Sequence, residues 1–239
     1  MASSTAIGQS QPQSQSQPFN RRHHEIDELV ELVQKLYCPL VEQLTKGYDA
    51  SHDVDHHLAV LANTSKIVKS LPDISYQTIK LLLVAAFVHD TIDHKYPGVE
   101  HKKIQLKDNM LEHHCREDVD KTLSWISCMS FSKQDADKCL PIPSSSQLMV
   151  DILRDGDRIE ALGPVGLQRC RDFIVGQNPD ISPDKAEELM YIHCQEKLAR
   201  LLPEGFITTV TGQELAAPGH QSIIDFMTSY QQKQEQKQA

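Results

Sequence analysis

Apolar residues recur every three or four positions along most of the chain, which is the spacing of one face of an α-helix. The segment 25–44 shows this pattern first. Its apolar stripe consists of Ile26, Leu29, Val30, Val33, Leu36 and Tyr37. Glycine and proline fall mainly between such segments, and no long stretch alternates apolar and polar residues as a half-buried strand would. The pattern therefore predicts an all-α fold with about eight or nine helices.

The other helices follow from the same periodicity. A second helix is expected after a cap at Ser51 or Asp53. Further helices are expected at 76–90, 101–112, 117–128, 147–162, 165–175, 184–201 and 221–230. The helix at 76–90 is apolar on nearly every side, so we expect it at the centre of the molecule.

The two ends of the chain have a different composition. Residues 1–20 are rich in Ser, Gln and Pro and have little apolar surface to bury, which predicts disorder. The polar segment 231–239 is also expected to be disordered. We therefore expect one domain, at 21–230.

The formal net charge of -9 argues against broad binding to a nucleic-acid polymer or an anionic membrane, because both favour a basic surface. A small phosphorylated substrate stays compatible with it, because a metal ion and a few local cations can override the overall field. The six cysteines include no Cys-x-x-Cys pair, which is typical of reduced thiols. No apolar run reaches the ~20 residues of a membrane span, and the N-terminus has no apolar signal segment. We expect a cytoplasmic protein, with the nucleus as an alternative.

The stretch 81–94, LLLVAAFVHDTIDH, carries the most hydrophobic run of the chain directly into ionisable side chains. A buried carboxylate at Asp90 needs a neutralising partner, because an unpaired buried charge is very unfavourable. A divalent metal ion would neutralise it, with His89 as a second ligand about 100° further around the helix. Asp93 lies one turn beyond and could hold or deprotonate a metal-bound water.

Other segments must complete the ligand set. His52 and His56 stand four residues apart in SHDVDHH, and Asp155 and Asp157 lie in an otherwise apolar helix. A mixed set of nitrogen and oxygen ligands suits Mn²⁺, Fe²⁺, Co²⁺, Mg²⁺ or Zn²⁺, and ligand type alone does not choose among them. The neighbouring Arg158 could bind phosphate oxygens.

These motifs, in this order, resemble the HD-domain superfamily of metal-dependent phosphohydrolases, and within it the small single-domain bacterial proteins of the YpgQ/YedJ type. The resemblance rests on five blocks of sequence. They are SHDVDHHLAV (51–60), VHDTIDHK (88–95), MSF (129–131), DGDRIEALG (155–163) and the segment 209–226. The resemblance implies one HD-domain helical bundle with additional C-terminal helices.

Carried over position by position, the resemblance implies the metal ligands His56, His89, Asp90 and Asp157. Asp155 is the rival of Asp157 for the last place and is otherwise expected behind the ligands as a hydrogen-bond acceptor. The chain departs from the family pattern elsewhere. Residues that could hold a nucleotide in the family are replaced at Val54, Ala59, His94 and Gly219.

The resemblance also implies roles beyond metal binding. Asp93 falls where related enzymes carry an acidic residue that positions or activates water, and Lys95 falls where the family has a lysine that could contact phosphate. Arg154 and Arg158 are each expected to be solvent-exposed, and Arg158 is the better candidate for binding phosphate because it follows a ligand. His57 is expected at the surface.

The sequence thus predicts an enzyme with one divalent metal ion, for which Mn²⁺ is the first choice and Fe²⁺, Co²⁺, Mg²⁺ or Zn²⁺ are alternatives. Metal-activated water would attack a phosphate ester or anhydride of a small compound, with a nucleotide as the expected substrate. Nucleoside triphosphate pyrophosphohydrolase and nucleotidase or phosphodiesterase activities are both open.

Two other functions remain open, as does a homodimer. One function is a dinuclear-iron oxygenase that recruits His113 or His114. The other is a non-catalytic module that binds a nucleotide and signals through a partner.

Overall fold

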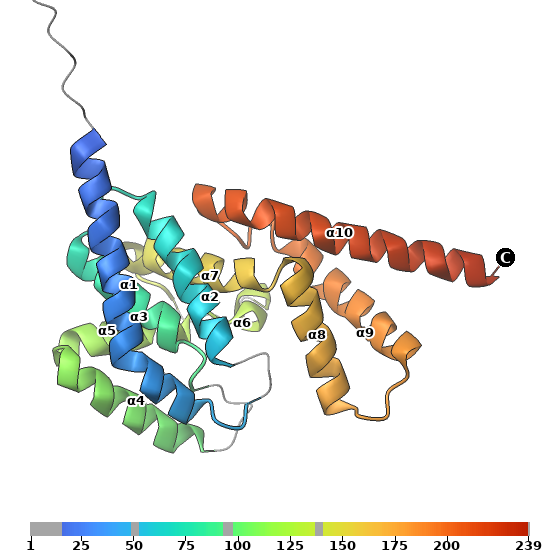
Figure 1. Cartoon of the computed structure of the whole chain (residues 1–239), viewed down its shortest axis with the longest axis horizontal. Coiled ribbons are helices and arrows are strands. Elements are labelled where there is room, and N and C mark those ends of the chain that lie inside the picture. The colour runs from blue at the N-terminus through green and yellow to red at the C-terminus, as the bar shows by residue number, and fades with distance from the viewer. Residues whose placement is uncertain (1–15, 49–52, 93–97, 137–140, 239) are drawn as a thin grey trace, which may run out of the picture.

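The structure, a computed structural model, describes residues 16–48, 53–92, 98–136 and 141–238. Within these ranges it is built of helices and contains no strand, so the all-α prediction is confirmed (Figure 1). The helices are α1 (Ser16–Leu44), α2 (Val54–Lys69), α3 (Tyr76–Val88), α4 (Val99–His113), α5 (Arg116–Ser127), α6 (Phe131–Asp135), α7 (Ser144–Glu160), α8 (Gly163–Gln177), α9 (Pro183–Glu196), the short 3-10 helix η1 (Leu198–Arg200) and α10 (Val210–Gln238).

Helix α3 lies at the centre of the larger part of the molecule. Every residue from Leu81 to Val88 is buried. Helices α1, α2, α5 and α7 pack against it. This confirms the prediction that the apolar run forms a central helix, and it means that the residues after Val88 leave the core from a fixed position.

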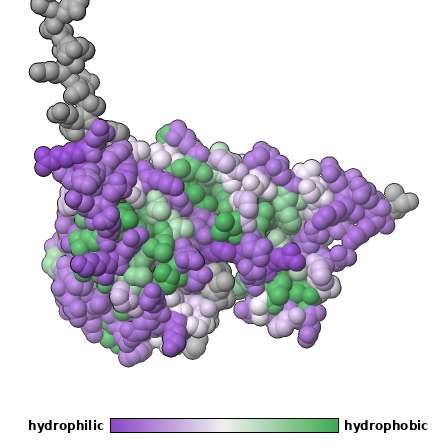
Figure 2. Space-filling view, viewed as in Figure 1, coloured by the Kyte–Doolittle hydropathy of each residue, from purple (hydrophilic) through white to green (hydrophobic). Residues whose placement is uncertain are grey.

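Helices α8 and α9 form a second part of the molecule, on the far side of α7 from α4 and α5 (Figure 1). Helix α10 lies along them. They share a smaller apolar cluster of their own, which consists of Leu162, Cys194, Leu198, Leu201, Ile207, Ala216 and Ile223. These are the additional C-terminal helices that the sequence predicts. Figure 2 shows mostly polar surface, with apolar patches both on the larger part of the molecule and on the lobe that contains α8 and α9.

Helices α2 and α7 approach each other closely because α7 has a glycine at the crossing. A Cβ atom placed on Gly156 would lie 2.4 Å from Thr64 Oγ1 on α2. A larger residue here would require the Thr64 side chain to move or the helices to separate. The two chain neighbours of Gly156 are Asp155 and Asp157, so the crossing also places these two carboxylates.

Both ends of the described chain are helical where the sequence predicts disorder. Helix α1 begins at Ser16, and α10 continues to Gln238. The end of α10 packs on α9: Tyr230 stacks on Tyr191 with ring centroids 4.5 Å apart, and Lys233 Nζ lies 2.5 Å from Glu187 Oε1. These contacts between helices are not visible in the composition of the segment. The expected disorder of residues 1–15 falls outside the described residues.

No helix in the described part of the chain is both long enough and apolar enough to cross a membrane.

Candidate metal centre

Helix α2 carries His56 in its first turn. The side chain of Asp53 caps the helix and accepts a hydrogen bond from the backbone N of His56 at 3.1 Å. The helix therefore begins at a defined residue, and the imidazole of His56 projects from it into the interior with 5 % of its surface exposed.

His89 follows directly on the last residue of α3. Its Nδ1 donates to Ala86 O at 2.9 Å, one turn back, and the residue is 6 % exposed. This bond fixes the ring and puts the proton on Nδ1, which leaves the lone pair of Nε2 available. The buried body of α3 thus ends in an oriented metal ligand.

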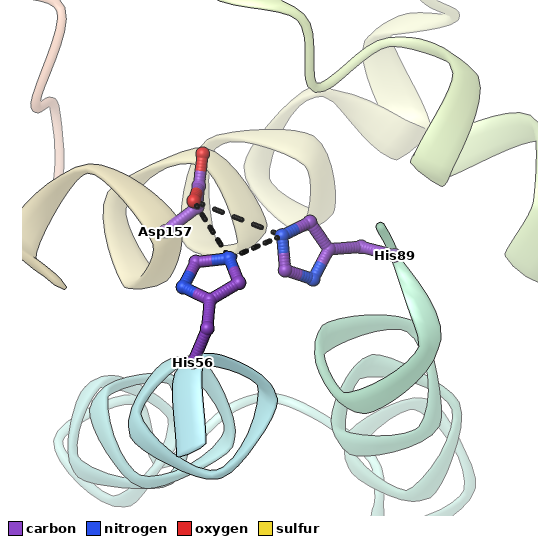
Figure 3. Close-up of side chains that lie close together, drawn as sticks. All are labelled: His56, His89 and Asp157. Atoms are coloured by element: carbon purple, nitrogen blue, oxygen red, sulfur yellow. Dashed lines mark hydrogen bonds and ion pairs between the residues drawn. The ribbon is translucent and has the colours of Figure 1, made fainter. Parts of the chain in front are cut away.

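Three side chains from three helices meet at one point (Figure 3). His56 Nε2 lies 3.3 Å from His89 Nε2, and Asp157 Oδ1 lies 3.6 Å from the former and 3.7 Å from the latter. The potential ligand atoms of these three residues all lie within 4.8 Å of one another. Residues 56, 89 and 157, far apart in the sequence, therefore form one cluster.

Asp90 lies at the edge of this cluster. Its Oδ2 is 3.5 Å from His56 Nε2 and 3.4 Å from His89 Nε2, and its side chain is 31 % exposed. It is not in the set of three whose atoms are all mutually close. Asp90 therefore fits as a ligand next to both histidines, on the side of the cluster that reaches solvent.

The spacing of these atoms suits a divalent cation. Nitrogen and oxygen atoms at ~2.1 Å from a common ion lie about 3.0–3.4 Å from one another. The three side chains of the cluster lie close to that spacing, as does Asp90 from each histidine. Two imidazoles with two carboxylates are a chemically suitable donor set for Mn²⁺, Fe²⁺, Co²⁺ or Zn²⁺. By geometry and by donor type, the residues fit a metal ion.

The charges of the cluster depend on one another. Burial disfavours a charge on His89, yet Asp90 and Asp157 outweigh it and raise the pKa of His89 well above its ordinary value. The same attraction lowers the pKa of both carboxyl groups, although their burial opposes it. Burial lowers the pKa of His56. Without an ion, the two carboxylates thus favour a proton on His89, and a bound cation would compete with that proton.

Two residues behind His56 were not found from the sequence. Glu160 Oε2 lies 3.2 Å from His56 Nδ1, and Arg169 of α8 forms an ion pair with the same oxygen. Glu160 stands one turn after Asp157 within the block 155–163, and this spacing could have indicated it. Nothing in the sequence near Arg169 points to the site.

The sequence suggested that His57 lies at the surface, and the structure shows that this expectation is wrong. It is fully buried, with its ring centroid 5.6 Å from that of His56 and 5.5 Å from that of His89. Burial lowers the pKa of His57 to about 3, so the ring is neutral. It is therefore an uncharged part of the wall behind the two ligands.

The arginines of α7 are not exposed either, which corrects the expectation from the sequence. Arg154 is 3 % exposed and donates from Nε and Nη2 to Cys128 O, at 3.0 and 2.7 Å. Arg158 is 2 % exposed, and its two terminal nitrogens donate to Phe206 O at 2.5 Å and to Gln134 Oε1 at 2.6 Å. The structure thus directs Arg158 toward the chain before α10 and toward α6, and its predicted contact with phosphate stays a prediction.

Asp155 lies apart from the cluster. It is fully buried and accepts hydrogen bonds from Thr208 N, Thr209 N and Thr209 Oγ1. It therefore ties the segment before α10 to α7, and the structure brings Asp157 to the histidines instead.

The other sequence candidates divide into two groups. Asp93, Lys95, His94 and His52 lie outside the described residues, so their predicted roles stay predictions. The proposed ligands of a second iron, His113 and His114, lie at the end of α4 against Tyr37 of α1, with ring centroids 5.9 and 6.4 Å away.

Comparisons with known proteins agree with the helical architecture. No protein-family model matches the chain. YpgQ of Bacillus subtilis is 27 % identical over 191 residues, which cover 78 % of this chain and 86 % of YpgQ. The protein L803 of Acanthamoeba polyphaga mimivirus is 31 % identical over 139 residues, which cover 52 % of this chain and 54 % of L803.

Solved structures superpose over most of the chain. Bacillus subtilis YpgQ in complex with ADP matches with a TM-score of 0.59 and 22 % identity, covering 87 % of this chain and 97 % of YpgQ. A protein from Lactobacillus plantarum matches with a TM-score of 0.66 and 20 % identity, over 87 % and 97 % of the two chains. An HD-superfamily hydrolase from Bacillus thuringiensis matches with a TM-score of 0.55 and 18 % identity, over 90 % and 98 %. The chain therefore has the all-α fold of YpgQ and of this HD-superfamily hydrolase.

Proposed function

We propose that the protein is a metal-dependent phosphohydrolase that acts on a small phosphorylated compound, with a nucleotide as the expected substrate. The observation that carries the proposal is the cluster of His56, His89 and Asp157, with Asp90 at its edge. It combines ligands for a divalent cation with a fold that a known HD-superfamily hydrolase also has.

The chemistry follows from what such a site does. A divalent ion held by these four residues would acidify a coordinated water and so supply a nucleophile near neutral pH. The buried histidines hold their rings fixed through Ala86 O and Glu160, so the ligand atoms need little rearrangement. The partly exposed carboxylates of Asp90 and Asp157 lie where the cluster reaches solvent, which gives a substrate access to it.

Three residues that the sequence assigns to catalysis complete the proposal. Asp93 would orient water or accept its proton, and Lys95 would contact phosphate. Arg158 would stabilise the charge of the phosphoryl group only if its guanidinium left its present partners on Phe206 and Gln134. We therefore rank Arg158 behind Lys95.

One observation supports a nucleotide, and the net charge is compatible with it. A YpgQ structure, with the same fold, is a complex with ADP. The net charge of -9 disfavours a nucleic-acid polymer, whereas it stays compatible with a small substrate whose phosphates are neutralised locally. Mn²⁺ as the metal and a cytoplasmic location are further parts of the proposal.

The test is hydrolysis of a panel of nucleoside mono-, di- and triphosphates, with the purified protein and Mn²⁺. We expect turnover by the wild type and a loss of at least about 10³-fold in Asp90→Ala and His89→Ala, because each removes a metal ligand. His24→Ala is the matched control, since this exposed histidine of α1 lies outside the cluster. Activity that survives in both ligand variants would overturn the proposal.

The same panel, together with metal analysis of the purified protein, decides between the three functions. Nucleotide binding without turnover, under every divalent metal, would favour the non-catalytic module. Two iron ions per chain would favour the oxygenase, whereas one ion per chain agrees with the cluster of three helices described above.

A further inference from the structure

The end of α1, the end of α3 and the start of α4 lie near one another beside the metal cluster. Figure 1 shows them at the same end of the larger part of the molecule as the start of α2, which carries His56. Tyr48, which follows α1, donates a hydrogen bond from its hydroxyl to Thr91 O at 3.1 Å. Thr91 comes directly after Asp90, the proposed ligand on the solvent side of the cluster. Tyr48 is therefore attached to the segment that carries two of the proposed ligands.

Lys102 of α4 lies against the ring of Tyr48. Its Nζ is 4.0 Å from the ring centroid, a distance at which the face of an aromatic ring attracts a cation. Both residues are half-buried, and burial lowers the pKa of the Lys102 ammonium. The ring thus holds the ammonium in place, and the ammonium has lost part of its contact with water.

Lys102 differs in this respect from the other two lysines of α4. Lys103 Nζ lies 2.7 Å from Glu100 Oε1, and Lys107 Nζ lies 2.7 Å from Asp120 Oδ1. Within the ranges that the structure describes, by contrast, no carboxylate forms an ion pair with Lys102. A ring face attracts a cation without neutralising its charge, so the ammonium can still donate hydrogen bonds to an anion.

A phosphate group is the anion that the proposed reaction brings to this end of the molecule. The phosphate that water attacks must lie at the metal ion, next to Asp90. Tyr48 bridges Lys102 and Thr91, so the ammonium stands one aromatic side chain away from the segment that carries the ligands. It is therefore placed for a phosphate that follows the attacked one along the substrate.

We propose that Lys102 binds a second phosphate group of the substrate and that Tyr48 is the positioning residue of this lysine. The inference rests on the proposed function, because it requires a first phosphate at the metal ion. It adds a substrate contact on α4, a helix that contributes no metal ligand to the cluster of His56, His89 and Asp157.

The binding of two related nucleotides measures the effect of the second phosphate alone. The first is AMP, and the other is an ADP analogue with a methylene bridge between its phosphates, which resists hydrolysis. Titration calorimetry of the full chain, at a fixed saturating concentration of Mn²⁺, gives both dissociation constants. We expect Lys102→Ala to bind the ADP analogue about 10–100-fold more weakly, as is typical when a hydrogen bond to a charged group is lost. The affinity for AMP and for Mn²⁺ should not change.

Two substitutions of lysine separate this contact from a general effect of charge. Lys103→Ala is the matched control, because it removes the same charge one residue further along α4 and should change neither constant. Lys102→Arg keeps the charge and should retain most of the affinity for the ADP analogue. An equal loss of affinity in Lys102→Ala and Lys103→Ala would overturn the proposal.

Two substitutions of Tyr48 test its positioning role. Tyr48→Phe keeps the ring beside Lys102 and loses only the hydrogen bond to Thr91 O, whereas Tyr48→Leu loses both contacts. We expect the larger loss of affinity for the ADP analogue in Tyr48→Leu, with little change for AMP. Equal losses for the two nucleotides would show that Tyr48 supports the fold of the site in general and does not position Lys102.

The outcomes distinguish this inference from the proposed function. If the wild type binds the ADP analogue through Lys102 but hydrolyses no nucleotide, the proposed function alone is wrong. If the protein hydrolyses ADP or ATP and Lys102→Ala has an unchanged KM for both, the role of Lys102 alone is wrong. A wild type that binds the ADP analogue no more tightly than AMP, or that binds neither, also contradicts the role of Lys102.

Discussion

Asp155 and Asp157 of α7, which are separated by one residue, have different roles. Positions two apart on a helix lie on nearly opposite sides, about 200° apart. Asp157 faces the two histidines with 34 % of its side chain exposed, whereas Asp155 is fully buried against Thr208 and Thr209. Burial raises the pKa of Asp155, and the hydrogen bonds from the two threonines act in the opposite direction. One aspartate can therefore serve metal binding and the other the fold.

Changing each aspartate to asparagine should separate these roles. Asp157→Asn is expected to lose the bound metal, because a neutral amide is a poorer ligand. Asp155→Asn should keep the metal but lower the free energy of unfolding by about 2 kcal/mol, because the amide places N–H groups against backbone donors. Metal content per folded chain and urea unfolding measure the two effects. If Asp155→Asn loses the metal and Asp157→Asn keeps it, then Asp155 is the ligand and the assignment of Asp157 is wrong.

His193 of α9 gives the stability of the protein a dependence on pH. Burial, aided by nearby Lys197, lowers the pKa of His193 to about 4, against about 6.5 in an unfolded chain. Between about pH 4 and pH 6.5, His193 is therefore protonated in the unfolded state but largely neutral in the folded state. The stabilisation is complete above about pH 6.5 and declines as the pH falls toward 4.

We expect the variant His193→Gln to be less sensitive to this fall in pH. The free energy of unfolding should drop between pH 7 and pH 5 by about 1–2 kcal/mol less in the variant than in the wild type. Urea unfolding of both proteins at the two pH values measures the difference, and the other histidines cancel in the comparison. Parallel curves would show that His193 titrates normally in the folded protein.

The sequence predicted which residues form the cluster better than it predicted their surroundings. The order of His56, His89, Asp90 and Asp157 along the chain resembles the family pattern. The structure brings the potential ligand atoms of His56, His89 and Asp157 within 4.8 Å of one another. Solvent exposure could not be inferred in the same way. His57 and Arg158 are polar and adjacent to ligands, yet both are buried, because helices distant in sequence cover them.

At the scale of elements, the crossing of α2 and α7 sets the distance between two ligands. His56 lies on α2 and Asp157 on α7, and Gly156 allows the close approach at Thr64. Helical periodicity predicted both helices. It could not predict their separation, which depends on which residue faces which across the contact.

Gly156→Ala should therefore disturb both stability and metal binding. The added methyl group would lie 2.4 Å from Thr64 Oγ1, so either the Thr64 side chain must leave its rotamer or the helices must move apart. We expect a loss of about 2 kcal/mol in unfolding free energy, typical of overpacking, and weaker binding of Mn²⁺. Urea unfolding and calorimetry measure the two quantities.

Thr64→Ala supplies the control for this crossing, because it removes the atom that the new methyl group meets. The double variant Gly156→Ala with Thr64→Ala should regain most of both losses. If the double variant is as impaired as Gly156→Ala alone, the contact with Thr64 does not set the spacing of the helices.

At the scale of the whole molecule, metal binding and folding are coupled, because the cluster exists only when α2, α3 and α7 are packed together. Mn²⁺ at about 100 times its dissociation constant should raise the free energy of unfolding by about 2.7 kcal/mol. Urea unfolding with Mn²⁺ and with a chelator measures the rise. His89→Ala should show no such rise, and an equal rise in that variant would indicate binding elsewhere.

Helical periodicity also predicted the all-α composition of the molecule and the central α3, and the resemblance implied the extra C-terminal helices. It did not predict that α10 continues to Gln238, because the polar end of that helix is held by pairs such as Tyr230 with Tyr191 rather than by an apolar stripe. Where a segment has no apolar stripe of its own, its contacts with other helices determine how far the helix extends.

The ligands at positions 56, 89 and 157 come from widely separated parts of the chain, so an ion held by them is also a cross-link. It closes one loop of 33 residues between the histidines and a longer one that ends in α7. Unlike a disulfide bond, this link exists only while the helices are packed, so it stabilises the folded state and leaves the unfolded chain unrestricted. The described cysteines are all free thiols, so that part of the chain has no covalent bridge of its own. Loss of the metal would thus shorten the lifetime of the folded protein against proteases, in addition to any effect on catalysis.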